Sequence, residues 1–288
     1  MKNKLLCIAL SSCFVLTGCT NSTSMEDIKI KTTSYPIEYI TNTLYEKHAD
    51  AIGSIYPDDV NINSYKLTNK QIKDFSNNDM FIYNGESNEP DYASELLNTN
   101  KSIMIIDAAK GMEYENSIEE LWLNPFNFLM LAQNIKNGFY EYIEDPYLKA
   151  EIQEKYDKLN VKVSELDVDF KTSIENATNK TIVVSSDLFK YLEKYGFNVI
   201  SLEENDNLND KIISDAKNLI KNGTIEYIFI KNNEETNETI NKIVSETGVK
   251  TETIHTLSNL TEDEREEEKD YLMLMHENIE KLRKELYK

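Results

Sequence analysis

Short apolar runs alternate with helix-length amphipathic segments along the chain from Ile28 onward. In the first half, the strand-length runs are Ile28–Thr33, Ala51–Tyr56, Met80–Asn84 and Ser102–Asp107. Helical patterns lie between them at Ile37–Lys47, Thr68–Phe75 and Pro90–Leu97. Strands that alternate with helices are typical of a parallel α/β sheet, because each parallel crossover needs a helix-length connection.

A second set of the same kind occupies the last third of the chain. Its strand-length runs are Thr181–Ser185, Asn198–Leu202, Ile225–Ile230 and Thr251–Thr256. Two helices, each closed by a glycine, are expected at Leu208–Lys221 and Glu235–Thr247. A last helix is expected to begin at Thr261, where a capping-box pattern opens an acidic run that leads into an apolar stripe.

One long helix is expected between the two sets. The stretch from Tyr147 to Thr181 contains no glycine or proline, and Asp145-Pro146 provides a cap and a first-turn residue. Apolar residues recur at steps of three and four at Ile152, Tyr156, Leu159, Val163, Leu166, Phe170 and Ile174. About 28 helical residues would extend roughly 42 Å, the length of two lobes. The same pattern also fits a coiled-coil partner, but the flanking sheet patterns favour an intramolecular spine.

The first 18 residues are expected to be a secretory signal and not part of the fold. A lysine-rich start precedes an apolar run from Leu5 to Leu16, which is too short for a permanent membrane span. The run ends in Leu16-Thr17-Gly18-Cys19, which resembles the lipobox of bacterial lipoproteins. In such proteins the signal is removed and the cysteine carries the lipid. The resemblance implies an extracytoplasmic protein anchored to the bacterial cell membrane through Cys19.

These patterns predict an α/β fold of two similar lobes with parallel sheets, joined by one long spine helix. The predicted parts are a signal peptide (1–18), a lipidated tether (19–27), an N-terminal lobe (28–142), a linking helix (143–178) and a C-terminal lobe (179–288). A chain of 288 residues is long enough for two medium-sized domains.

Composition and motifs exclude several functional classes. The chain has 31 Lys+Arg against 51 Asp+Glu, so a basic nucleic-acid-binding face is not expected. Gly-x-Gly-x-x-Gly, Walker A, His-Glu-x-x-His and Gly-x-Ser-x-Gly motifs do not occur, and the chain has three histidines. Acidic pairs such as Glu203-Glu204 are interpreted as surface residues. An enzyme is therefore not expected.

Several segments together resemble the solute-binding lipoproteins of zinc and manganese ABC importers, the family that includes the adhesin lipoproteins. The segments, in chain order, are Thr32–Pro36, Asp79–Gly85 with Glu89, Leu121–Asn127, Asp145-Pro146 with Tyr156, Ser185–Phe189 with Tyr191, Tyr195 and Gly196, and Tyr271–Met275 with Asn278. The resemblance covers nearly all of the mature chain. It implies two α/β lobes, a long connecting helix and a metal ion bound between the lobes.

The resemblance also implies four metal-ligand positions, and this chain departs from the family pattern at them. Family members use mostly histidines with one or two carboxylates. The matching positions here are Asn63, Glu120, Ser186 and His255. Glu120 is expected to be the charged ligand, His255 the imidazole, Asn63 an oxygen donor and Ser186 a group that holds water. Zinc prefers imidazole and thiolate ligands, so this oxygen-rich set shifts the expectation towards Mn²⁺ or Mg²⁺.

The predicted function is that of a monomeric solute-binding lipoprotein, which captures one divalent cation, Zn²⁺ or Mn²⁺, and delivers it to an ABC permease in the membrane. The altered ligand positions leave a second interpretation open. In that alternative, a paralogue of the same fold has lost metal binding and acts as an adhesin-like surface binding or interaction lipoprotein.

Overall fold

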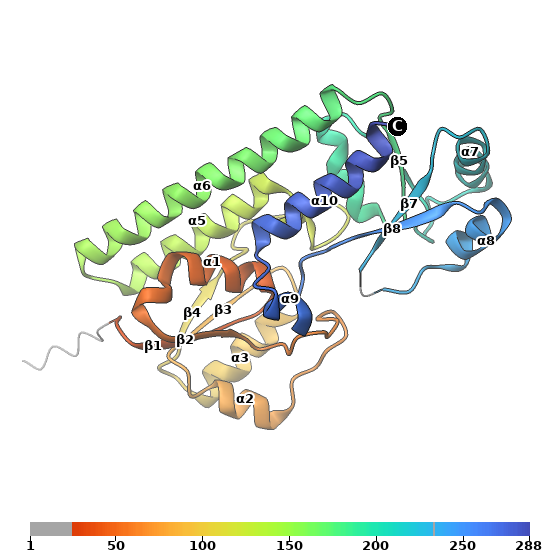
Figure 1. Cartoon of the computed structure of the whole chain (residues 1–288). Coiled ribbons are helices and arrows are strands. Elements are labelled where there is room, and N and C mark those ends of the chain that lie inside the picture. Colours follow the sequence, from red (N-terminus) through yellow and green to blue (C-terminus); the bar gives the residue numbers. More distant parts are fainter. Residues whose placement is uncertain (1–24, 233) are drawn as a thin grey trace, which may run out of the picture.

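The computed structural model describes residues 25–232 and 234–288, which form two α/β lobes (Figure 1). Each lobe contains a four-stranded parallel sheet, as the alternating pattern predicts. The predicted signal peptide and Cys19 lie outside the described residues. Within the described part of the chain, no helix is both long and apolar enough to cross a membrane.

The N-terminal sheet has the strand order β2-β1-β3-β4. Its strands are β1 (Ile28–Thr32), β2 (Ala49–Ser54), β3 (Met80–Tyr83) and β4 (Met104–Asp107). Ile30 pairs with Ile52 on one side and Met80 on the other. The surrounding helices are α1 (Tyr35–Tyr45), η1 (Glu46–His48), α2 (Asn69–Phe75) and α3 (Glu89–Thr99). All four strands run in the same direction, so the loops that follow them gather at one edge of the sheet.

The C-terminal sheet repeats this arrangement with the order β6-β5-β7-β8. Its strands are β5 (Thr181–Val184), β6 (Asn198–Ser201), β7 (Tyr227–Lys231) and β8 (Lys250–Ile254). Val183 at its centre pairs with Ile200 and Ile228. The helical elements of this lobe are η2 (Asp187–Tyr195), α7 (Asp210–Lys221) and α8 (Glu238–Thr247). Gly248 ends α8 with a left-handed backbone, as the glycine in the sequence predicts.

The spine helix α6 (Pro146–Glu175) has 30 residues and runs along both lobes (Figure 1). The Asp145 side chain caps its first turn by accepting a hydrogen bond from the backbone N–H of Tyr147 at 2.8 Å. The helix packs against α1, α5 (Pro125–Tyr142) and α10 (Tyr271–Leu286). Its buried stripe, which includes Ile152, Val163 and Phe170, belongs to a hydrophobic core that continues into both lobes. The predicted spine is confirmed.

The last predicted helix is wrong in one respect, because it is divided into α9 (Glu262–Glu266) and α10. The capping box at Thr261 closes on Glu264, as predicted. The helix then breaks, with Glu268 in the left-handed region at φ 55°. A new helix begins after Asp270, whose side chain accepts a hydrogen bond from the backbone N–H of Met273 at 2.8 Å. An Asp before an apolar stripe is a strong N-cap, and here it stops the acidic helix from continuing.

Candidate metal site

Asn63 lies in the loop that follows β2, at the carboxyl edge of the N-terminal sheet. The side chain of Asn61 shapes this loop by accepting a hydrogen bond from the backbone N–H of Asn63 at 2.9 Å. The Asn63 side chain is exposed and lines a cavity of about 780 Å³ in the N-terminal lobe. An oxygen donor at this position is therefore accessible.

Glu120 begins the short helix α4 (Glu120–Leu123) and is buried. Its carboxylate accepts hydrogen bonds from the backbone N–H groups of Glu115 (3.2 Å) and Asn116 (3.0 Å) and from the Asn116 side-chain amide (2.8 Å). Burial, and secondarily the negative charge of Glu120, raises the pKa of Tyr191 in η2 of the C-terminal lobe. Glu120 therefore acts electrostatically on a residue of the other lobe.

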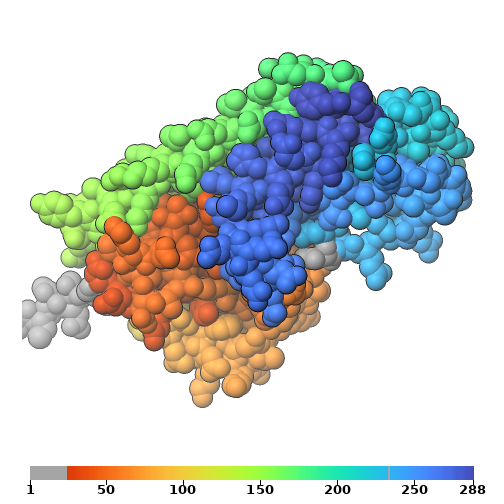
Figure 2. All heavy atoms as spheres, viewed as in Figure 1, coloured from red at the N-terminus to blue at the C-terminus, as the bar shows by residue number. Residues whose placement is uncertain are grey.

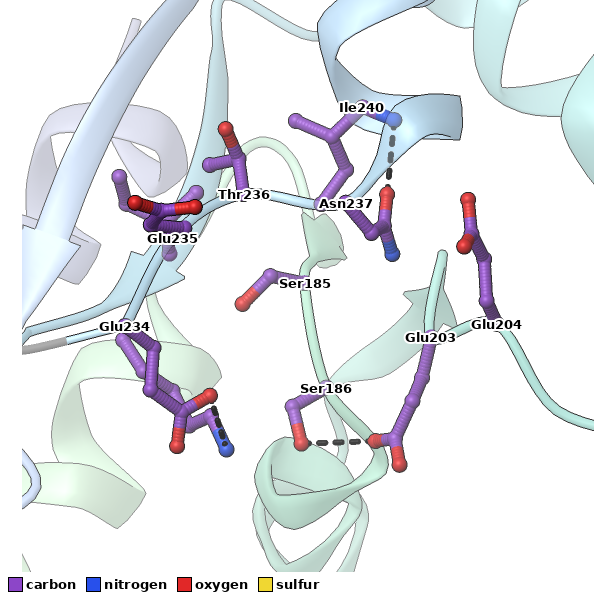
Figure 3. Close-up of a pocket in the computed structure, with 11 residues that line it drawn as sticks. Ser185, Ser186, Glu203, Glu204, Glu234, Glu235, Thr236, Asn237 and Ile240 are labelled. Carbon is purple, nitrogen blue, oxygen red and sulfur yellow. Dashed lines mark hydrogen bonds and ion pairs between the residues drawn. The ribbon is translucent and has the colours of Figure 1, made fainter.

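Ser186 caps η2 and lines a different cavity, of about 260 Å³, at the carboxyl edge of the C-terminal sheet (Figure 3). Its hydroxyl donates to Glu203 Oε2 at 2.7 Å and accepts from the backbone N–H of Leu188 at 3.2 Å. The same carboxylate oxygen accepts from the backbone N–H of Asp187 at 2.5 Å. Glu203 is therefore a structural partner of Ser186 and lines the cavity, a role that sequence reasoning missed when it interpreted the Glu203-Glu204 pair as surface.

His255 directly follows β8 and is buried, 7% exposed. Its Nδ1 accepts a hydrogen bond from the backbone N–H of Leu257 at 2.9 Å, which leaves the proton of the neutral ring on Nε2. Nε2 faces the Glu264 carboxylate, with contacts of 3.2 and 3.3 Å to its two oxygens. The backbone of His255 is held by the amide of Asn278, which both donates and accepts.

The His255 contact strongly affects Glu264. Burial alone would raise the pKa of this carboxyl, but hydrogen bonds from His255 and Thr261 outweigh burial and lower it to about 2. Glu264 is therefore a carboxylate at neutral pH. Sequence reasoning interpreted Glu264 as a capping-box residue, and it missed this second contact because β8 and α9 become neighbours only in the folded chain.

Two of the four predicted positions are linked across the lobe boundary. The indole N–H of Trp122, two residues after Glu120, donates to the carbonyl oxygen of Thr256, next to His255, at 2.8 Å. Asn63 and Asn116, the partner of Glu120, line the same N-terminal cavity. Ser186 instead faces Glu203 in the C-terminal cavity. Among residues 25–232 and 234–288, no three His, Cys, Asp or Glu side chains are grouped to hold a metal ion. The four-residue set stays a prediction.

The segment from His255 to Asp270 fastens the C-terminal lobe to the N-terminal lobe (Figure 2). Arg265 donates to both oxygens of Glu38 at 3.0 and 2.9 Å and to Asp58 at 2.5 Å. The side-chain amide of Asn259 donates to the carbonyl oxygens of Pro57 (2.7 Å) and Val60 (3.2 Å). The bidentate Arg265–Glu38 ion pair and the two hydrogen bonds of the Asn259 amide fix the orientation of this segment on the N-terminal lobe.

The floor of the N-terminal cavity contains a buried carboxyl group, Glu89, at the start of α3. It accepts hydrogen bonds from the backbone N–H of Asn84 (2.8 Å) and the hydroxyl of Tyr56 (3.2 Å). These contacts favour the ionised form, but burial dominates and raises the pKa of Glu89 from 4.5 to about 7.

The raised pKa of Glu89 predicts a pH-dependent stability. The folded chain binds the Glu89 proton more tightly than the unfolded chain, so this contribution is complete below pH 4.5 and is lost as the pH rises through about 7. A shift from 4.5 to about 7 corresponds to roughly 3 kcal/mol. Glu89→Gln, which mimics the protonated group, should raise the free energy of unfolding at pH 8 and leave it nearly unchanged at pH 4.5. Urea denaturation of both proteins at the two pH values measures this difference, and equal effects at both would contradict it.

The chain has two parallel-sheet lobes, one long helix that connects them, and candidate ligand positions at the lobe boundary. This is the architecture of a solute-binding protein whose lobes are joined by a single helix. The sequence profile described as "Zinc-uptake complex component A periplasmic" (ZnuA) matches residues 30–285. The chain belongs to this family, whose members are solute-binding components of zinc uptake.

Individual relatives agree with this assignment. The chain is 22% identical over 310 residues to the high-affinity zinc uptake system protein ZnuA of Bacillus subtilis, with 96% of each chain covered. It is 25% identical over 323 residues to the zinc-binding protein AdcA of Streptococcus pyogenes serotype M6, covering 98% of this chain but 61% of that longer protein. The Zn(II)-bound ZnuA-like domain of Streptococcus pneumoniae AdcA superposes with a TM-score of 0.72 at 21% identity, covering 91% of this chain and all of that one. The structural match confirms the predicted fold.

Proposed function

We propose that this chain is the extracytoplasmic solute-binding component of a divalent-metal ABC importer, with Zn²⁺ as its principal cargo. The observation that carries the proposal is the family match across residues 30–285, together with the hydrogen bond that joins Trp122 and Thr256. That bond connects the chain segments of Glu120 and His255, the two strongest metal donors of the predicted set. The adhesin-like alternative is favoured by one observation, that residues 25–232 and 234–288 contain no group of three His, Cys, Asp or Glu side chains placed to hold a metal ion, and it becomes an outcome of the metal-binding test.

Glu264 strengthens the donor set. Its carboxylate lies 3.2 Å from His255 Nε2, and two ligands of a tetrahedral zinc ion, each at about 2.0–2.1 Å, are separated by roughly 3.3 Å. A metal ion that replaces the proton shared by these groups would gain an imidazole and a second carboxylate without movement of the backbone. Glu120 is not grouped with this pair in the described part of the chain, so it would have to move towards them on binding. With Glu120, two carboxylates would then balance the charge of a divalent ion, which a single carboxylate does not.

Asn63 and Ser186 have supporting roles in this proposal. The exposed amide of Asn63 supplies an oxygen donor from the loop after β2. Ser186 already donates to Glu203 and accepts from Leu188, so it positions water or orients Glu203 instead of binding the ion directly. A serine hydroxyl that keeps its proton is a poor metal donor.

Metal selectivity tests the proposal directly. Residues 25–288, stripped of metal and dialysed against equal concentrations of Zn²⁺ and Mn²⁺, should retain about one zinc ion per chain and little manganese. The reason is that a given site of nitrogen and oxygen donors binds Zn²⁺ more tightly than Mn²⁺ in the Irving–Williams order, which outweighs the preference that the oxygen-rich set alone would give to Mn²⁺. Elemental analysis by mass spectrometry gives both contents. A chain that retains neither ion would support the adhesin-like alternative.

We further propose that Cys19 carries a lipid anchor and that the folded part is a monomer held at the extracytoplasmic face of the bacterial cell membrane. Its proposed partner is an ABC permease in that membrane. The Leu16-Thr17-Gly18-Cys19 sequence supports the anchor. Cys19→Ser should move most of the protein from the membrane fraction to the soluble fraction when it is expressed in a bacterium. Immunoblots of the two fractions measure the shift, with Cys13→Ser as the matched control, and an unchanged distribution would contradict the anchor.

A further inference from the structure

The N-terminal cavity contains binding groups that metal capture does not use. The cavity lies where the loops after the N-terminal strands gather, and its volume is about 780 Å³. Three almost fully buried polar side chains form part of its lining: Ser34, Asn84 and Glu89. None of the three belongs to the predicted ligand set. A pocket of this size with a few convergent polar groups is the ordinary form of a small-molecule site.

The Ser34 hydroxyl is the strongest sign of a missing ligand. Ser34 is 1% exposed and lines the cavity, and its Oγ has no hydrogen-bond partner among the described residues. Ser34 also precedes α1 without capping it through its side chain. A buried hydroxyl without a partner costs free energy, and a bound ligand with a polar group at this point would satisfy it.

The neighbouring Glu89 carboxyl is the buried acidic acceptor of the cavity. It accepts hydrogen bonds from the Asn84 backbone N–H at 2.8 Å and the Tyr56 hydroxyl at 3.2 Å, and the hydroxyls of Thr33 and Ser87 also contact it. Its donors are all neutral groups, and a charged donor makes a stronger hydrogen bond to a carboxylate than a neutral one does. An ammonium group could therefore replace one of the hydroxyl donors.

Aromatic rings and acidic residues line the rest of the cavity. The rings are those of Tyr56, Tyr65, Tyr92, Tyr114 and Trp122. The exposed carboxylates at its rim are Glu86, Asp91 and Glu95, against a single lysine, Lys66. Aromatic faces attract cations, and an acidic rim concentrates cations and repels anions. The charge distribution therefore favours a cation over a neutral polyol or an organic acid.

We propose that this cavity binds a small organic cation, an aliphatic amine whose ammonium group reaches Glu89 and Ser34 while its hydrocarbon part lies against the tyrosine rings and Trp122. Ammonium groups donate three hydrogen bonds, which matches the acceptors on the cavity floor. Glu120, His255 and Glu264 are not among the residues that line the cavity. The proposal therefore stands independently of metal capture, although Asn63 lies at the margin of both sites.

Trp122 provides the readout, because it is the single tryptophan of the chain and lines the cavity. Residues 25–288 are titrated with hexane-1,6-diamine at pH 8 in the presence of a metal chelator, and hexane-1,6-diol is the matched neutral probe. We expect a saturable change of tryptophan fluorescence with the diamine and none with the diol at equal concentration. Equal responses to the two probes, or no response to the diamine at millimolar concentration, would overturn the proposal.

Two variants locate the binding. Glu89→Gln should weaken diamine binding at least tenfold, and Ser34→Ala should weaken it severalfold without loss of stability, because that hydroxyl has no partner to lose. Asp206→Asn, which removes an equal charge from the exposed surface of the other lobe, should have no effect. Undiminished binding by both cavity variants would contradict the assignment. Zinc titration of the same variants should give wild-type values, which separates this proposal from the metal-binding function.

Discussion

Trp122→Ala is expected to lower the free energy of unfolding by about 3–5 kcal/mol, the usual cost of deleting a large buried aromatic side chain. Trp122 is 1% exposed and joins three parts of the fold. Its indole N–H donates to Thr256 at 2.8 Å, and its carbonyl oxygen accepts from the Tyr271 hydroxyl at 2.6 Å. Tyr271 in turn stacks on Phe128, with ring centroids 3.9 Å apart. Loss of the indole therefore opens a cavity where the two lobes meet.

Urea denaturation followed by circular dichroism measures this change. Trp122→Phe separates packing from hydrogen bonding, because it keeps a ring but leaves the buried Thr256 carbonyl without its donor. A smaller loss of about 1–3 kcal/mol is expected for this variant. Tyr147→Ala, at a tyrosine that is 84% exposed, should cost less than about 0.5 kcal/mol. A loss below 1 kcal/mol for Trp122→Ala would show that this contact does not hold the lobes together.

Zinc affinity is expected to fall at least a hundredfold in His255→Ala and at least tenfold in Glu120→Gln. His255 is the one imidazole of the proposed site, and Glu120 is its buried carboxylate, two residues before Trp122, whose indole N–H donates to Thr256 next to His255. Removal of an imidazole removes the donor type that zinc prefers. Glu264→Gln should have an intermediate effect, because it removes charge while keeping one oxygen of the side chain.

Matched controls use the same residue types outside the site. His276→Ala removes an exposed histidine of α10, and Glu115→Gln removes an exposed carboxylate beside Glu120. Both should retain wild-type affinity in competition with a fluorescent zinc chelator. Wild-type affinity in Glu120→Gln and His255→Ala together would exclude the proposed ligands, whatever the stability of the variants.

The sequence predicted the regular elements well because their physical cause is local. Strands such as β3 and β5 are dense apolar runs, and the spine helix has a strong cap at Asp145 and an uninterrupted buried stripe. In contrast, helix α5 was missed although Asn124 and Pro125 form a good start, because its apolar residues are not confined to one stripe. Helix α5 is covered on one side by the N-terminal sheet and on another by α6, so apolar residues are needed on more than one face. The alternation of apolar and polar residues that marks a half-exposed helix is therefore weak in its sequence.

The candidate site was less accessible to sequence reasoning because its contacts join distant segments. Glu264 reaches His255 only because the chain turns back after β8, and Glu203 reaches Ser186 across neighbouring strands β5 and β6. The family resemblance supplied the positions Asn63, Glu120, Ser186 and His255, but it could not supply the partners that occupy those side chains. Such contacts depend on three-dimensional packing, and the periodicity of apolar and polar residues in the sequence does not predict them.

Isothermal titration calorimetry of metal-free residues 25–288 with Zn²⁺, paired with melting curves, tests the central claim most directly. The account predicts one site per chain with a dissociation constant in the nanomolar range. It also predicts a melting temperature that rises with zinc concentration, since a ligand that binds the folded state stabilises it. No heat of binding and no change in melting temperature at high micromolar Zn²⁺ would contradict metal capture, while leaving the fold and the family assignment unchanged.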